Sequence, residues 1–278
     1  MKKFRRIIIK TISVVAFLFS ILAFSQEAIP SLKGKNIIYI YGGLKGHSPM
    51  ESVDFFVPKL RAEGAKVKVY DNLKVYTDEK IMNETDLIIQ IFTLEKISDE
   101  EFKGLERAIF NGTGLAGWHG GLGDAFRDNL KYQFIVGGQF VSHPGGHIDH
   151  TIRVINNNDP ITKGVDDFNL KKTEQYYMLV DPNIKVLAVS KFEKDRYERP
   201  GKKENKVTGS VMPVVWKKNY GKGRVFYSSI GHFLTDFDVP EVLKIQMRGF
   251  RWASEGKYHQ QENLIFPIYG NEENYHEK

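Results

Sequence analysis

The sequence predicts an α/β fold in which helices cover both faces of a mostly parallel sheet. Two runs, 36–41 and 87–92, are almost entirely apolar, as strands buried on both faces are. From residue 36 to about residue 135 strand patterns alternate with helical patterns, which favours parallel strands joined by right-handed crossovers. After residue 138 the pattern changes to short strands and loops, which indicates an added β-rich segment.

The first strand and its helix flank a histidine. Strand 36–41 leads into a glycine-containing loop that ends at His47. Ser48-Pro49-Met50-Glu51 then combines three helix-start signals: Ser as N-cap, Pro at the first helical position and Glu three residues after the cap. Apolar residues at helical spacing follow until Gly64, which ends the helix.

Two further strands and two helices follow in alternation. Strand 65–70 and the buried strand 87–92 enclose a short helix at 77–83. Ser98 and Glu101 form a second capping box, whose helix ends at Asn111-Gly112.

The stretch 115–123 has the pattern of a strand, a tight turn and the start of a helix that extends over about 122–135. Gly120 and Gly121 permit positive φ angles and a close approach of the backbone to a ligand. Ligands of open α/β sheets bind at the carboxyl ends of the strands. We therefore expect His119 at the floor of a cleft.

The β-rich segment ends in a hairpin and a last helix. Its expected parts are a loop at 139–147, strands at 150–155 and 186–190, an aromatic and acidic cluster at 173–177 within 168–180, a charged surface excursion at 191–209, a hairpin of 211–216 with 224–229, and a helix opened by 238–241. Gly231-His232 directly follows the hairpin.

Residues 1–25 are predicted to be a cleaved signal peptide. Five Lys/Arg residues precede an apolar run at 11–24, and Ala23-Phe24-Ser25 has the small-x-small pattern of a cleavage site. The run is short for a bilayer span, so we expect a secreted or periplasmic protein without a membrane span after cleavage. The rest, 26–278, is predicted to be a single domain with a core at about 36–256 and a polar tail at 257–278.

Charge and cysteine content exclude several function classes. The whole chain carries a net charge of +6, and the five basic residues of 1–25 leave +1 for the remainder. No basic patch therefore argues for a nucleic-acid partner. The chain has no Cys, which excludes disulfides, a thiol nucleophile and thiolate metal sites. Walker-type, GxSxG and GxGxxG motifs are also absent.

Five histidines fall in predicted loops: His47, His119, His143, His147 and His232. Three of them follow strands directly, and parallel strands end at the same edge of a sheet, so we expect these imidazoles to converge. Glu174 could join them from the aromatic and acidic cluster.

Two chemistries fit these residues. Neutral imidazoles with a carboxylate suit a divalent metal such as zinc, and the same groups can act as general acid and base without metal.

Aromatic residues border the polar positions. They are Trp118, Tyr176, Tyr177, Trp216 and Phe233. Sugar C–H faces stack on aromatic rings while the hydroxyl groups form hydrogen bonds, so this composition fits a sugar-binding cleft. For Trp216, packing in the core is the better interpretation.

A series of short motifs runs through the chain between residues 36 and 256. They are the loop with His47, Gly117-Trp118-His119-Gly120-Gly121, Gly137-Gly138-Gln139-Phe140 with His143-Pro144, Glu174-Gln175-Tyr176, Pro213-Val214-Val215-Trp216, the segment 220–227, Gly231-His232 and the segment 248–253. In these motifs and their order the chain resembles the ThuA-like family, which is named for trehalose utilisation.

The resemblance implies a fold like that of class I glutamine amidotransferases, a flavodoxin-like layer with additions. Those enzymes carry a Cys at the strand-turn-helix elbow, where this chain has Trp118-His119, so glutaminase activity is excluded. ThuA-like proteins are linked to the breakdown of disaccharides through keto-sugar intermediates. His147 looks like a feature of a subgroup.

We therefore expect a carbohydrate-catabolism enzyme that acts on a glycoside or keto-sugar by hydrolysis, elimination or isomerisation. The candidate catalytic residues are His119, Glu174 and His143; the candidate sugar contacts are Trp118, Tyr176, Gln175 and His147; the candidate ligands of a divalent metal are His47, His119, His143 and His232. A non-catalytic sugar-binding module and a structural partner in a saccharide-processing complex are the alternatives. The expected partner is a small saccharide, and the sequence leaves the oligomeric state open.

Overall fold

The computed structural model describes residues 30–193, 196–197, 204–205 and 207–259. The predicted signal peptide, nearly all of the predicted tail and part of the predicted excursion at 191–209 lie outside these residues. No helix within the described ranges is long and apolar enough to cross a lipid bilayer.

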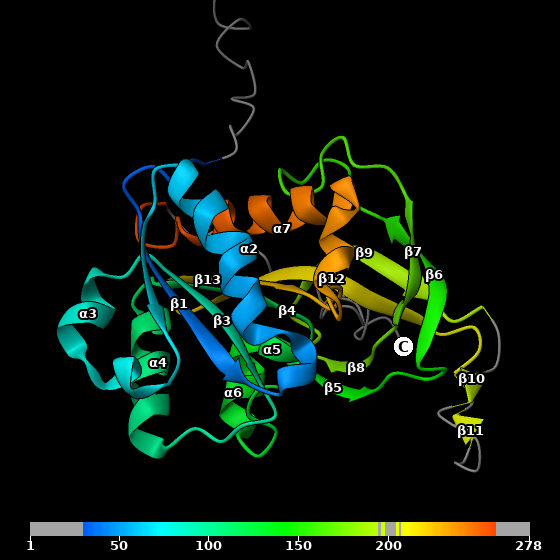
Figure 1. Cartoon of the computed structure of the whole chain (residues 1–278), viewed down its shortest axis with the longest axis horizontal. Coiled ribbons are helices and arrows are strands. Elements are labelled where there is room, and N and C mark those ends of the chain that lie inside the picture. Colours follow the sequence, from blue (N-terminus) through cyan, green and yellow to red (C-terminus); the bar gives the residue numbers. More distant parts are fainter. Residues whose placement is uncertain (1–29, 194–195, 198–203, 206, 260–278) are drawn as a thin grey trace, which may run out of the picture.

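Five parallel strands form one side of a nine-stranded sheet, including one of its two edges (Figure 1). They are β1 (Asn36–Gly43), β2 (Lys66–Tyr70), β3 (Leu87–Thr93), β4 (Gly114–Trp118) and β13 (Gly223–Ser228). Their order across the sheet is β2-β1-β3-β4-β13, and each adjacent pair is parallel. This is the flavodoxin-like order of a doubly wound sheet, and it confirms the predicted α/β class.

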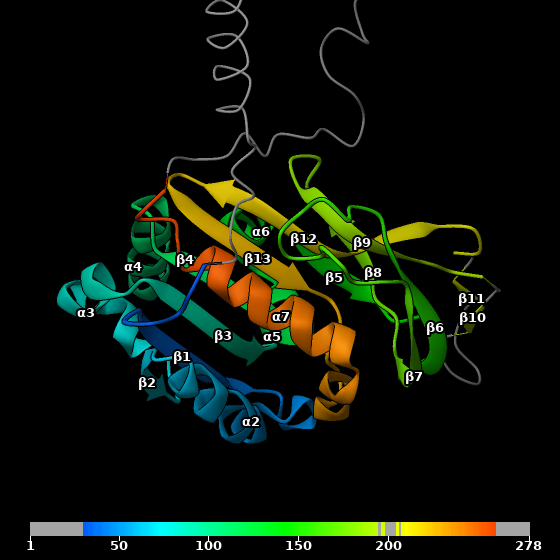
Figure 2. The ribbon, with the colours of Figure 1, turned by 90° about the horizontal axis from the view of Figure 1, so that it is seen from above.

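Four antiparallel strands extend the sheet beyond β13 (Figure 2). They are β12 (Val211–Tyr220), β9 (Lys185–Lys191), β6 (His147–Val154) and β7 (Phe168–Glu174). Two small ladders pair β5 (Gly138–Ser142) with β8 (Tyr177–Val180) and β10 (Arg196–Tyr197) with β11 (Glu204–Asn205). The predicted β-rich segment is confirmed, but the expected loop at 139–147 is partly wrong because it contains β5 and the first residue of β6.

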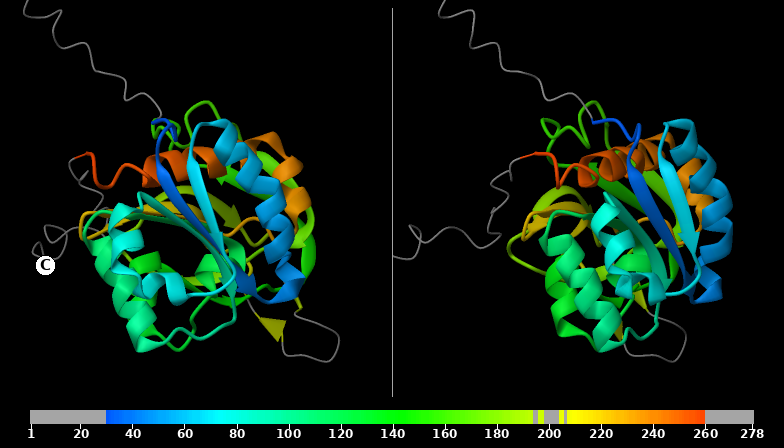
Figure 3. Two further views of the ribbon diagram at one scale, coloured as in Figure 1. Left: turned by 60° about the vertical axis from the view of Figure 1, so that its left-hand side comes forward. Right: turned by 90° about the vertical axis from the view of Figure 1, so that its left-hand side faces the viewer.

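Helices cover both faces of the sheet, as predicted (Figure 3). On one face α2 (Pro49–Ala62) and α7 (Pro240–Ala253) bury Phe56, Leu60 and Phe250 with the apolar sheet residues. On the other face α3 (Glu79–Glu84), α4 (Asp99–Phe110) and α6 (Leu130–Val136) do the same with Met82, Leu105 and Ile135. Strands buried on both sides explain the nearly continuous apolar runs in the sequence.

The two predicted capping boxes have different outcomes. At α4, Ser98 Oγ accepts from the Glu101 amide and the Glu101 carboxylate accepts from the Ser98 amide, so that prediction is confirmed. At α2, Pro49 does begin the helix, but Ser48 has a φ of 49° and its side chain makes no capping bond. The amide of Ser48 instead closes the 3-10 helix η2 (Lys45–His47). The chain turns here in a way that directs His47 back over the sheet edge.

The single helix expected over 122–135 is wrong. The structure has two short helices, α5 (His119–Gly123) and α6, separated by residues 124–129. Asn129 Oδ1 accepts from the Tyr132 amide and starts α6 with a new N-cap. Two shorter 3-10 helices, η3 (Lys74–Thr77) and η4 (Leu234–Asp238), complete the described helices.

Candidate functional site

His119 directly follows β4 and is the first residue of α5, at the carboxyl edge of the parallel strands. It is 1% exposed and has a φ of 47°, a left-handed conformation that is uncommon for a residue with a side chain. The following turn has no room for side chains, because a Cβ on Gly120 would lie 2.7 Å from His47 Cε1 and one on Gly121 would lie 2.7 Å from Ile91 Cα. The glycines thus allow His119 to approach the end of β1.

The hydrogen bonds of His119 fix which ring nitrogen faces the site. Nδ1 lies 3.0 Å from the Ser229 carbonyl oxygen, which can only accept, so Nδ1 carries the proton. In the neutral ring Nε2 therefore presents a lone pair. Around it lie the Tyr176 hydroxyl at 2.7 Å, His232 Nδ1 at 3.2 Å and Glu174 Oε2 at 3.2 Å.

His47 and His232 reach the same point from the ends of β1 and β13. His47 Nδ1 lies 3.0 Å from Thr93 Oγ1 at the end of β3. This contact occupies Nδ1, so Nε2 is the ring nitrogen that is left to bind a ligand. The ring centroids of His47 and His119 are 4.8 Å apart. His232 Nδ1 lies 3.2 Å from Glu174 Oε2. A Cβ on Gly231, whose φ is 110°, would lie 2.5 Å from Trp118 Cδ1, so the chain before His232 runs close to β4.

These four side chains form what we call the inner cluster: His47, His119, Glu174 and His232. One ligand atom from each lies within 4.8 Å of all the others. A tetrahedral zinc ion with ligand bonds of about 2.0–2.1 Å separates its ligand atoms by about 3.3 Å. The three separations of 3.2 Å among His119, His232 and Glu174 match that value. The donor set therefore fits a divalent transition metal.

Burial and charge favour the protonation states that a metal requires. Burial lowers the pKa of His119, and burial together with the neighbouring imidazoles lowers the pKa of His47 to about 3. Burial alone would raise the pKa of Glu174, but its contacts with His119 and His232 outweigh burial and hold that pKa well below its ordinary value. Neutral imidazoles thus face an ionised carboxylate.

Two further histidines flank the other carboxylate oxygen of Glu174. His143 Nε2 lies 3.5 Å and His147 Nε2 lies 3.9 Å from Oε1. Their side chains are 30% and 49% exposed, whereas that of His119 is 2% exposed. We call His143 and His147 the outer pair. The site therefore opens to solvent on the Oε1 side of Glu174.

The structure brings together seven residues singled out from the sequence: His47, His119, His143, His147, Glu174, Tyr176 and His232. Tyr176 stacks on His119 with ring centroids 4.0 Å apart, and burial raises its pKa well above the ordinary value, so the hydroxyl stays protonated.

Two of the predicted sugar contacts, Trp118 and Gln175, are buried among other side chains. Trp118 is 2% exposed and packs against Phe56 and Phe237 in the core between the sheet and the helices α2 and α7. Gln175 is 2% exposed, and its Nε2 donates to Ser190 Oγ and the Lys191 carbonyl. Both side chains are therefore engaged by contacts within the protein. The interpretation of Trp216 as a core residue is confirmed, because it is fully buried and donates to the Val136 carbonyl.

Sequence reasoning missed the residues that hold the inner cluster in place. Thr93, Ser229 and Tyr227 contact His47 or His119 through a hydroxyl or a carbonyl group. The only signal for Thr93 is a polar residue at the end of an apolar strand. Arg127, whose guanidinium pairs with Asp124 and lies over the Phe140 ring, was also missed.

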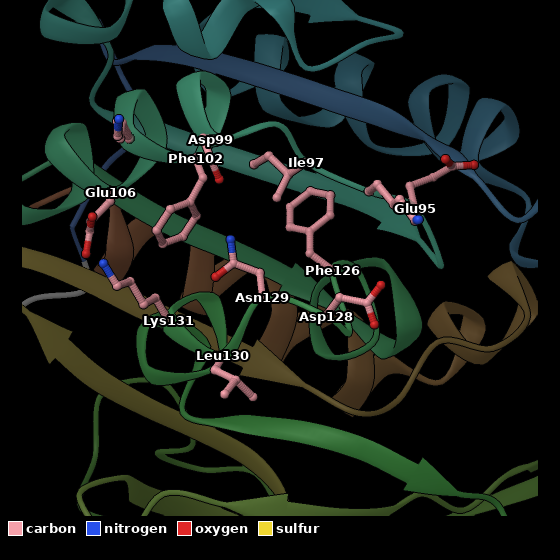
Figure 4. A pocket seen from close by; sticks show the side chains of 12 residues that line it. Glu95, Ile97, Asp99, Phe102, Glu106, Phe126, Asp128, Asn129, Leu130 and Lys131 are labelled. Carbon is pink, nitrogen blue, oxygen red and sulfur yellow. The ribbon is translucent and has the colours of Figure 1, made fainter.

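A separate hollow of about 640 Å³ lies between α4 and residues 124–131 (Figure 4). Ile97, Phe102 and Phe126 line it together with charged residues of both signs. None of the seven residues of the candidate site lines this hollow. Its mixed charges point to no particular ligand, so the site of interest is the histidine cluster.

Two solved structures similar to this chain are of ThuA-like proteins. One, from Bacteroides uniformis, has a TM-score of 0.66 and 20% identity, and the match covers 82% of this chain and 92% of that one. The other, from Parabacteroides merdae, has a TM-score of 0.60 and 18% identity, covering 84% and 95%. At these identities the likeness shows the fold. No curated protein matches the chain.

A match to a family model shows which protein family this chain belongs to. The ThuA model, described as trehalose utilisation, matches residues 37–253, which run from the second residue of β1 to the end of α7 and include all residues of the candidate site. The family suggests carbohydrate utilisation in general. This chain belongs to the ThuA family.

Proposed function

We propose that this protein is a secreted or periplasmic enzyme of carbohydrate catabolism that acts on a glycoside or keto-sugar with the help of a divalent metal. The observation that carries the proposal is the convergence of three imidazoles and one carboxylate within 4.8 Å at the carboxyl edge of the parallel strands. Metal-binding imidazoles are usually oriented by a contact of their other ring nitrogen, and His119 and His47 have such contacts with the Ser229 carbonyl and the Thr93 hydroxyl.

His47, His119, His232 and Glu174 would hold the ion, for which zinc is the reference case. A bound divalent metal polarises a carbonyl oxygen or lowers the pKa of a bound water. The chain supplies the orientation: Ser229 fixes His119, Thr93 fixes His47, and Glu174 contacts His119 and His232 with the same oxygen. Tyr176 stays protonated and can donate a hydrogen bond toward the same point.

His143 is the proposed proton-transfer group. It is more exposed than the inner cluster, and its Nε2 faces the open side of Glu174 at 3.5 Å. A carbonyl group acidifies the neighbouring C–H of a keto-sugar, so a base at this position could remove that proton in an elimination or isomerisation. In hydrolysis the same imidazole could take a proton from water. Glu174 contacts His119 with one carboxylate oxygen and His143 with the other. It would orient these two histidines or serve as the base itself.

The test combines metal analysis with turnover. Purified protein is stripped with a chelator, reloaded with zinc, manganese or nickel, and assayed on disaccharides and their 3-keto forms. One bound ion per chain, turnover that depends on it and loss of turnover in His119→Ala support the proposal. Turnover by metal-free protein would assign the site to acid–base chemistry alone. Sugar binding without product from any substrate would identify a binding module instead.

A further inference from the structure

Phe233 is an exposed aromatic ring directly beside the candidate site. It follows His232, and 37% of the residue is exposed. Its ring lies against His232 at a centroid distance of 4.3 Å and against His147 at 5.0 Å. The ring thus borders the side on which the site opens to solvent.

The backbone of Phe233 is held in a fixed position relative to Glu174. Its amide donates to Asp236 Oδ2 at 3.3 Å, at the start of η4. Asp236 is 6% exposed and the same oxygen accepts from Thr173 Oγ1 at 2.8 Å. Thr173 precedes Glu174 in β7. A buried carboxylate therefore couples the exposed ring to the strand that carries the catalytic carboxylate.

We propose that Phe233, together with His147, forms an outer sugar subsite. The ring would stack on the C–H face of a pyranose, and the half-exposed imidazole of His147 would bond to a hydroxyl of the same ring. A first sugar ring at the inner cluster and a second ring on Phe233 require a substrate of at least two rings. This inference rests on the proposed function, since it assumes that the inner cluster receives a sugar.

The experiment compares two probes, trehalose with two rings and methyl α-glucoside with one. Their dissociation constants are measured by ligand-observed NMR on the full chain loaded with zinc. Phe233→Ala should weaken trehalose binding roughly 3- to 10-fold, the range expected for loss of one aromatic contact, and leave methyl α-glucoside unchanged. Phe233→Trp should retain trehalose binding. Phe110→Ala removes a ring that is 58% exposed at the opposite edge of the sheet and serves as the control.

Equal trehalose affinity in Phe233→Ala and the wild type would overturn the outer subsite, as would an equal loss for both probes or no binding of trehalose by the wild type. Zinc binding by each variant is measured on the same samples. Failure of the proposed function would appear as a wild-type chain without metal or turnover. Failure of the subsite would appear as a zinc-loaded, active protein whose affinity for trehalose is unchanged by Phe233→Ala.

Discussion

His119 Nε2 lies 3.2 Å from His232 Nδ1 although 113 positions separate the two residues. The topology of the sheet accounts for this contact. β4 and β13 are parallel neighbours with Trp118 opposite Ser228, so both strands end at the same height and the residues that follow them meet. Glu174 Oε2 completes a triangle with sides of 3.2 Å. Three distant parts of the chain thus build this triangle, and His47 from a fourth part completes the inner cluster.

Removal of His232 is predicted to abolish metal binding. His232→Ala deletes one corner of this triangle, and we expect zinc affinity to fall at least roughly 100-fold, since the loss of a ligand costs more than the loss of an orienting contact. His259→Ala is the matched control, because that imidazole is 54% exposed and pairs with Glu255 outside the site. Zinc per chain is measured after dialysis. Full zinc occupancy in His232→Ala would contradict the assignment.

Tyr227→Phe is predicted to weaken metal binding without touching a ligand. The Tyr227 hydroxyl donates to the His119 carbonyl at 3.1 Å and supports the left-handed conformation of His119. We expect a loss of about 1–2 kcal/mol in the free energy of unfolding and roughly 10-fold in zinc affinity.

The control for Tyr227 is Tyr39→Phe. This change deletes a buried hydroxyl that donates to Ser52 Oγ at a distance of 2.8 Å, and neither residue belongs to the inner cluster. It should lower stability by a similar amount and leave zinc affinity unchanged. Denaturant unfolding and zinc titration are run on both variants. If the two variants lose zinc affinity equally, the effect of Tyr227 is general destabilisation and not positioning of His119.

The sequence pattern was sufficient for the sheet and for three members of the inner cluster. Runs that are apolar on both faces identify β1 and β3 as parallel-sheet strands, and the histidines that follow β1, β4 and β13 had to share an edge. The same apolar runs hide the direction of each side chain. Both faces of β4 are buried, so the pattern could not show that Trp118 points into the core while His119 points into the site.

Short-range sequence signals failed to predict the role of a residue where tertiary contacts determine its conformation or its partners. Ser48 has the sequence of an N-cap, but the preceding 3-10 turn takes its amide and places it in a left-handed conformation. Gln175 follows Glu174, and its side-chain amide donates to Ser190 and Lys191 of β9. In the sheet β6 separates β9 from β7, an order that the sequence pattern could not show.

Acid is predicted to destabilise the metal-free protein more than its surface charges alone would. The pKa of His47 is lowered from 6.5 to about 3 by burial and by His119 and His232, so the unfolded state binds a proton that the folded state does not. The contribution of neutral His47 to the free energy of unfolding is fully present above pH 6.5. It is lost as the pH falls toward about 3, at up to about 1.4 kcal/mol per pH unit.

The measurement for His47 is the free energy of unfolding in chelator between pH 7 and pH 4. His47→Gln removes the titrating group and keeps a polar side chain, so its stability curve should be flatter than that of the wild type over this range. Parallel curves for the two proteins would show that His47 is not buried in its neutral form. His259→Gln, which changes a half-exposed imidazole, should leave the slope nearly unchanged.

Gly120→Ala is predicted to damage the site by steric contact alone. The added Cβ would lie 2.7 Å from His47 Cε1 and 2.8 Å from Thr93 Cγ2, so His47 must move away from its contact with Thr93. We expect a loss of about 1–3 kcal/mol in stability and a loss of zinc affinity. Gly46→Ala is the control: it lies next to His47, but its Cβ would meet only Leu44 Cγ at 4.0 Å. Zinc titration and thermal unfolding compare the two. If Gly120→Ala binds zinc as the wild type does, His47 is not held at the cluster by close packing against the turn after β4, and its place among the metal ligands is wrong.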